Sequence, residues 1–181
     1  MKNLIKLMLA FLVVTSFSCT KDLGMVTIST TLNDVIHMDV DQTPTEDPII
    51  FEAIEMEIDI ENTDTQSYMG NIEEITFENL TFTFENFEGD VNGLISLKFK
   101  DAYGTEFFSA DNININDAVS NQTQFEVTNL SMLDAMVAEL LAESTATVAY
   151  SGSYVCSDDN MSFDLKYNAD VRVKTNVAVE D

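Results

Sequence analysis

The chain has 181 residues, with 32 Asp and Glu side chains against eight Lys and Arg and a formal net charge of −24 at pH 7. This charge excludes nucleic acid and anionic lipid headgroups as close partners, since both are bound through Lys and Arg. Only two prolines and six glycines occur, and 45% of the residues are hydrophobic, which indicates one folded domain rather than a disordered chain.

The first element in the chain is an N-terminal leader. Lys2 and Lys6 precede an uncharged apolar run over residues 7–14, and residues 16–19 (SFSC) end it with small side chains around a cysteine. A positive start, a short apolar segment and a small-residue end are the three parts of a secretory signal. The run is shorter than the roughly 20 residues that a membrane-spanning helix needs. Residues 1–18 are therefore interpreted as a signal peptide.

Because the leader ends in a cysteine, it resembles a bacterial lipoprotein signal, whose lipobox has Leu or Val three residues before Cys. This chain has Ser16 there, with Val13 and Val14 just upstream. The resemblance implies that Cys19 receives a diacylglyceryl group, becomes the N-terminus by cleavage and is then N-acylated. More than one acyl chain is what stable anchoring requires. Residues 19–24 would then be a lipidated tether, and an ordinary cleaved signal peptide is the alternative.

The residues after the cysteine indicate the membrane to which such a lipoprotein would be sorted. Thr20 follows Cys19, in place of the Asp that marks inner-membrane retention in enteric bacteria. The tract over residues 19–22 (CTKD) resembles the short charged signals that send Bacteroidota lipoproteins to the outer face of the outer membrane. The resemblance implies an outer-membrane protein at the cell surface or the periplasmic face, in contact with the membrane through the lipid on Cys19.

Residues 25–181 have the pattern of a single all-β domain. Apolar and polar residues alternate over residues 26–40 and over 54–61, on either side of a proline-containing loop at residues 41–48. Alternation of this kind predicts strands with one buried and one solvated face. In the second strand the solvated face consists of carboxylates: Glu55, Glu57, Asp59 and Glu61.

The middle of the chain predicts a change of strand parity and a hairpin. Apolar positions over residues 75–77 have one parity and those over 80–84 have the other, so a bulge at residues 78–79, or a strand crossing between two sheets, is expected. Strands over residues 95–99 and 105–108 are joined by a turn at residues 101–104.

One segment has a helical period. Its apolar residues recur at spacings of three and four from Leu130 to Leu141, which predicts an amphipathic helix of about 13 residues. Asn129 or Ser131 is expected to cap its start, and Ser131 with Asp134 forms a variant of the capping box.

The most regular strand pattern covers residues 163–173. Its apolar parity persists for the whole stretch, which predicts a central strand of the core. Strands do not alternate with helices along the chain, so the fold class is all-β, mainly an antiparallel β-sandwich with one packed amphipathic helix. A partly open barrel that encloses a ligand is the alternative.

Calcium is the one cofactor for which the sequence offers candidates. Asp39, Asp41, Glu46 and Asp47 place four carboxylates around one loop, and hard cations prefer such oxygen ligands. Residues 111–117 and the turn at residues 157–160 are also rich in oxygen donors, but none of these segments has EF-hand spacing. The simpler interpretation is a solvated surface without a resident cofactor.

Catalytic chemistry has few candidates. His37 is the only histidine and is expected on the solvated face of its strand, opposite Ile36 and Met38. A zinc site of nitrogen and sulfur ligands would have only His37 and Cys156. With Cys19 lipidated, Cys156 has no second cysteine for an internal disulfide. The protein is therefore interpreted as not being an enzyme, and a hydrolase is the least favoured function.

The resulting functional hypothesis is an outer-membrane-anchored lipoprotein with a non-enzymatic binding or structural role at the cell envelope, toward a protein or glycan partner. A carrier of a lipid or other hydrophobic ligand is the first alternative and would hold its ligand between the sheets. A calcium-dependent adhesion module is the next alternative.

Overall fold

The computed structural model describes residues 23–41, 45–156 and 160–178. Two α-helices are found there, α2 (Ile115–Ser120) and α3 (Asp134–Glu143), with two 3₁₀ turns, η1 (Met69–Asn71) and η2 (Leu130–Leu133). The strands are β1 (Leu23–Asp41), β2 (Thr45–Asp59), β3 (Ile72–Gly89), β4 (Leu94–Asp101), β5 (Glu106–Asn114), β6 (Gln124–Glu126), β7 (Thr145–Cys156) and β8 (Asn160–Ala178).

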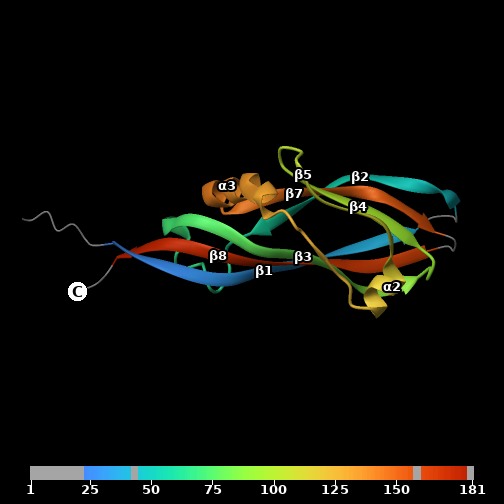
Figure 1. The fold of residues 1–181 in the computed structure, drawn as a ribbon, viewed down its shortest axis with the longest axis horizontal. Helices are drawn as coiled ribbons and strands as arrows, with labels where there is room; N and C mark the ends of the chain where they lie inside the picture. Colours follow the sequence, from blue (N-terminus) through green and yellow to red (C-terminus); the bar gives the residue numbers. More distant parts are fainter. Residues whose placement is uncertain (1–22, 42–44, 157–159, 179–181) are drawn as a thin grey trace, which may run out of the picture.

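The strands form two antiparallel sheets that pack face to face (Figure 1). One sheet has the order β1-β8-β3-β6 and the other has the order β2-β7-β4-β5. The first strand pairs with the last, the second with the seventh, the third with the sixth and the fourth with the fifth. This nested pairing is the topology of a jelly roll. The predicted antiparallel sandwich is confirmed, and the two separate sheets argue against the barrel alternative.

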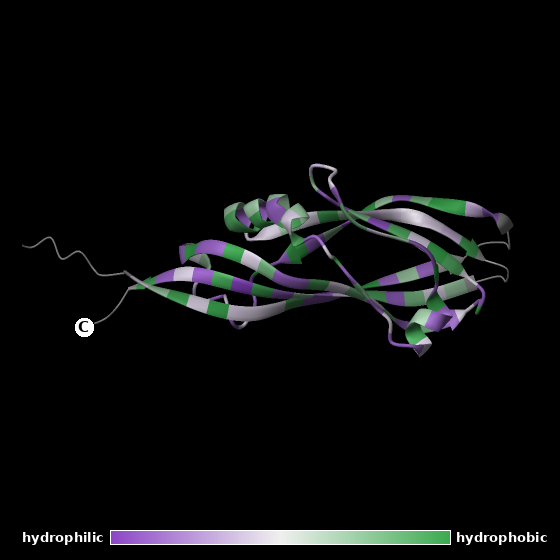
Figure 2. Cartoon of the chain, viewed as in Figure 1, coloured by the Kyte–Doolittle hydropathy of each residue, from purple (hydrophilic) through white to green (hydrophobic). Residues whose placement is uncertain are grey.

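The core lies between the inner faces of the sheets, and the alternation that places it there is visible as bands of colour along the strands (Figure 2). In β8, between β1 and β3, the inward residues from Met161 to Thr175 are all buried, which confirms the predicted central strand. Across the sheets, Phe82 stacks on Phe99 with ring centroids 4.3 Å apart. Phe84 meets Phe163 edge-on at 5.5 Å. Burying such a ring contributes about 1.5–3 kcal/mol.

The predicted change of parity in β3 is a β-bulge. Phe77 pairs with Val171 and Asn79 with Asp170, so Glu78 is the extra residue on the β3 side. A single inserted residue moves the following side chains to the opposite face of a strand. Both Phe77 and Leu80 are buried as a result, although their sequence positions have opposite parity.

The helices differ from the sequence-based expectation. The predicted helix of about 13 residues is the 3₁₀ turn η2 followed by α3, and neither has a side-chain cap at its start. The Ser131 hydroxyl donates instead to the side chain of Asn129 at 2.7 Å, because the 3₁₀ turn shifts the α-helical start to Asp134. The amphipathic packing is confirmed, with Met136 and Leu140 of α3 buried.

Helix α2 was not expected at all. Its six residues follow β5 directly, and the side-chain oxygen of Asn114 accepts a hydrogen bond from the Asp117 backbone N–H at 2.8 Å, as an N-cap does. Residues 111–117 are therefore a strand end and a capped helix start. In the part of the chain that the structure describes, no helix is long and apolar enough to cross a membrane.

Candidate functional site

A groove opens between β1 and β2, the edge strands of the two sheets. It has a volume of about 260 Å³. One wall comes from β1 and the other from β2 and the loop that follows it, and the ring of Tyr167 reaches it from β8. The residues that line the groove are Thr31, Leu32, Asn33, Asp34, Glu57, Asp59, Glu61, Asn62 and Tyr167. The lining contains four carboxylates and no Lys, Arg or His.

Tyr167 lies on the inward parity of β8 and is directly opposite Asp34 of β1. Its side chain is largely removed from water, since the residue is only 4% exposed. Its burial, and to a smaller extent the charges of Asp34 and Asp59, raise the pKa of the Tyr167 hydroxyl to about 12. The hydroxyl makes no hydrogen bond to another described residue, and its oxygen is not one of the fully buried unpartnered atoms, so it is open to the groove. Tyr167 therefore presents its hydroxyl to the groove from a side chain that is otherwise buried, near the carboxylates of Asp34 and Asp59.

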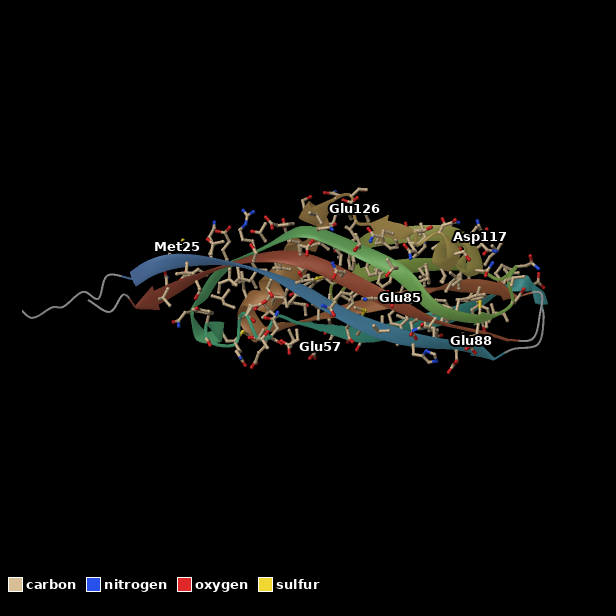
Figure 3. The ribbon with its side chains drawn as sticks, turned by 90° about the horizontal axis from the view of Figure 1, so that it is seen from below. Met25, Glu57, Glu85, Glu88, Asp117 and Glu126 are labelled. Carbon is tan, nitrogen blue, oxygen red and sulfur yellow. The ribbon has the colours of Figure 1, made fainter. Side chains whose placement is uncertain are left out.

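Two of the carboxylates are held in place by their own backbone. One oxygen of Asp34 accepts the Val35 N–H at 2.8 Å, and one oxygen of Asp59 accepts the Glu61 N–H at 2.7 Å. Each carboxylate keeps its second oxygen for another donor. Glu57 is exposed on β2, as the sequence predicted for that face, and Figure 3 shows it at one long edge of the sandwich.

The loop after β2 is tied to β1 by a small polar network. The hydroxyl of Thr30 donates to Asp64 and accepts from the Asn62 amide, both at 3.0 Å. Thr65, which is fully buried, donates to the Ile60 carbonyl at 2.6 Å and so closes the loop on itself. Because these bonds join the two sheets beside the groove, its walls are positioned before any ligand arrives.

His37 lies outside the groove, on the solvated face of β1 as predicted. Its Nδ1 is 2.7 Å from Asp164 and its Nε2 is 3.2 Å from Asp39. The hydrogen bond to Asp164 and the charge of Asp39 raise the pKa of His37. Hydrogen bonds from Asn86 and His37 lower the pKa of Asp164. Both ring nitrogens of His37 are thus engaged by carboxylates.

The predicted site residues are only partly placed by the structure. Cys19 and the side chains of Asp41 and Glu46 lie outside the described residues, as does most of the turn at residues 157–160. Asp39 contacts His37, and Asp47 is exposed. Across the described ranges, no group of three or more His, Cys, Asp or Glu side chains is arranged to hold a metal ion. Calcium at the four candidate residues stays a prediction.

The groove was not predicted from the sequence, although two signals pointed to it. Tyr167 is the one residue with a hydroxyl among the inward positions of residues 163–173, and a buried hydroxyl normally has a partner. The carboxylates at 57, 59 and 61 were predicted as a solvated strand face, which is confirmed. Nothing in the sequence indicated that Asp34 would lie opposite them.

Comparisons with known proteins give no family for this chain. No family model matches it, and neither does any curated protein. Among solved structures it is similar to one described as Desmodium yellow mottle tymovirus, with a TM-score of 0.40 and 11% identity over 88% of this chain and 85% of the other. It is also similar to a decameric BFDV capsid protein, with a TM-score of 0.40 and 12% identity over 82% of this chain and 99% of the other. Resemblance at this level carries no inference about function.

Proposed function

We propose that this chain is an outer-membrane-anchored lipoprotein with a non-enzymatic binding role at the cell envelope, exerted through the groove between β1 and β2. The observation that carries the proposal is the leader, in which a positive start and a short apolar run end in Ser18-Cys19. The lipid on Cys19 is the membrane contact in this proposal.

The fold supports a defined orientation for a protein anchored in this way. Leu23 is four residues after Cys19, so the two Cα atoms are at most about 14 Å apart. Leu23 pairs with Ala178, so β1 begins beside the end of β8, at one end of the long axis (Figure 1). Asp34 lies about 36 Å further along β1 at about 3.3 Å per residue. The groove would therefore stand clear of the bilayer and face the envelope space.

Two features favour binding over the other functions considered. The space between the sheets is filled at its centre by the stacked rings of Phe82 and Phe99, where a carrier would hold a hydrophobic ligand. The two carboxylates on His37 occupy both nitrogens that a hydrolase would use to activate a hydroxyl.

The anchor is tested by replacing Cys19. In cells grown with a labelled fatty acid, Cys19→Ala is expected to abolish labelling and to move the protein from the membrane pellet to the soluble fraction. Cys156→Ala, which removes the chain's other cysteine, is the matched control and should stay labelled and membrane-bound. A Cys19→Ala protein that pellets as firmly as the control would contradict the proposal.

A further inference from the structure

We infer that the groove between β1 and β2 binds an organic cation, an alkylammonium or guanidinium group, which its carboxylates and the Tyr167 hydroxyl receive together. The inference rests on the binding role proposed above and names the chemistry of the ligand. Such a group can come from a free polyamine or from a Lys or Arg side chain of a partner protein.

The first argument is charge. The groove is lined by Asp34, Glu57, Asp59 and Glu61, and none of them is paired with a Lys, Arg or His within the described chain. A cleft lined by one sign of charge between walls of low dielectric concentrates counter-ions and raises their association rate. A cation that enters this groove displaces no basic side chain of the protein itself.

The second argument is Tyr167. The Tyr167 residue is only 4% exposed, and its hydroxyl makes no hydrogen bond to another described residue. The hydroxyl is open to the groove, which has a volume of about 260 Å³ and so has room for a small ligand. An N–H donor of a bound cation would donate to the phenol oxygen while its charge is balanced by Asp34 and Asp59. One bound cation would then contact the phenol oxygen and the free carboxylate oxygens together.

The third argument is the spacing of the carboxylates. A bare metal ion needs several oxygens within about 2.6 Å of one point. The groove side chains do not converge in this way, since no metal-holding cluster exists among the residues that the structure describes. An ammonium or guanidinium group carries several N–H donors on a larger frame, and guanidinium binds carboxylates in a fork. The arrangement therefore fits an organic cation better than a metal.

The test uses the full-length protein in a non-ionic detergent and isothermal titration calorimetry. The probes are spermidine and a peptide with two arginines, acetyl-Gly-Arg-Gly-Arg-Gly-amide. The same peptide with citrulline for arginine keeps the shape and removes the charge. Calcium chloride and sodium chloride at matched ionic strength are the inorganic controls. Saturable binding of spermidine or the arginine peptide, absent for the citrulline peptide and sodium, is the expected result.

Variants locate the binding. Asp34→Asn with Asp59→Asn is expected to weaken the affinity at least tenfold, and Tyr167→Phe three- to tenfold, as the loss of one hydrogen bond does. The matched control is Glu88→Gln with Glu126→Gln, which also removes two exposed carboxylates and is expected to bind within twofold of wild type. Should the aspartate variant fail to melt cooperatively, Glu57→Gln at an exposed position takes its place, with an expected threefold loss.

The outcomes distinguish the two sources of the cation, and they distinguish cation binding from the proposed lipid anchor. Tighter binding of spermidine supports a free polyamine, and tighter binding of the arginine peptide supports a partner side chain. The inference is overturned if groove and control variants bind alike, or if calcium alone saturates the groove. Membrane fractionation of the groove variants is unaffected by either result, so loss of cation binding with retained membrane association leaves the proposed anchor intact.

Discussion

Two acidic regions on either side of β1 differ in how their charge is balanced. On the outer face of the β1-β8-β3 sheet, three basic residues of β8, Lys166, Arg172 and Lys174, each form an ion pair with a glutamate of β3. In the groove between β1 and β2, four carboxylates have no basic partner in the described part of the chain. Of these two acidic regions, only the groove lacks compensating bases among the described residues.

The difference originates in the alternation of a single strand. Outward positions of β8 carry the bases, and its inward positions carry the apolar stripe that includes Tyr167. The bases can therefore balance carboxylates on one face only. The groove is therefore distinguished by its lack of nearby bases rather than by its number of acidic residues, since its four carboxylates are exposed.

The largest expected effect tests whether β8 supports both regions. Phe163→Ala removes a fully buried ring that packs on Phe84 and is expected to lower the free energy of unfolding by about 3–5 kcal/mol. Lys166→Ala on the outer face of the same strand is expected to change it by no more than about 0.5 kcal/mol. Urea unfolding measures both, and equal losses would contradict the assignment of the core.

The next effect is on the groove alone. Tyrosinate absorbance should report a Tyr167 pKa of about 12. Asp34→Asn with Asp59→Asn should lower that pKa, which stays above the ordinary value of 10 because burial is its largest cause. Because the pKa is raised in the folded state, the folded protein favours the neutral Tyr167 hydroxyl. The stability that depends on this neutral form is complete below pH 10 and is lost as the pH rises from 10 through about 12. Tyr167→Phe should remove that transition, and its persistence would assign it elsewhere.

A smaller effect should have opposite signs in the two regions. Glu57→Gln in the groove relieves repulsion between unpaired carboxylates and is expected to stabilise the fold by about 0.3 kcal/mol. Glu74→Gln breaks the pair with Lys174, 2.7 Å away, and is expected to destabilise it. The Lys174 hydrogen bond lowers the pKa of Glu74 in the folded protein. The contribution of this pair to stability is therefore present above pH 4.5 and is lost as the pH falls through the lowered pKa. If both variants shift the melting temperature in the same direction, the two regions do not differ in how their charge is balanced.

The smallest effect concerns His37 on the outer face. Because the Asp164 hydrogen bond is the main cause of its raised pKa, Asp164→Asn should bring that pKa back toward 6.5. The stabilisation by the pair is complete below pH 6.5 and is lost as the pH rises through the folded value. The His37 side chain is 61% exposed, so high salt should weaken the shift as well. An NMR titration that is the same in the variant and in wild type would contradict this pairing.

Local patterns were sufficient to predict much of the fold. The alternation over residues 163–173 predicted β8, and the parity change at residues 78–79 predicted the bulge, because both follow from the period of two in a strand. The sandwich followed from the number of half-buried strands. The nested order of the sheets did not, since it depends on pairings between distant segments such as β1 and β8.

The candidate site could not be predicted from local sequence patterns either, because it also depends on pairing between distant segments. Asp34, Asp59 and Tyr167 come from three separate strands, and only the register of β1 on β8 and the packing of the sheets bring them together. The predicted start of the helix was also wrong, because the residues that resembled a cap lie in or next to the 3₁₀ turn η2. Helix α2 has six residues, too few to show a period, although Asn114 is a recognisable N-cap once the helix is known.

The pairing of β1 with β8 also determines when the chain can fold. β1 is synthesised first, and β8, which lies between β1 and β3, is synthesised last. Until its final residues are present, the sheet lacks the strand that joins β1 to the rest. Folding dominated by such distant pairings takes milliseconds to seconds. Under the proposed export, this delay would keep the polypeptide unfolded during its passage and would leave folding to the far side of the membrane.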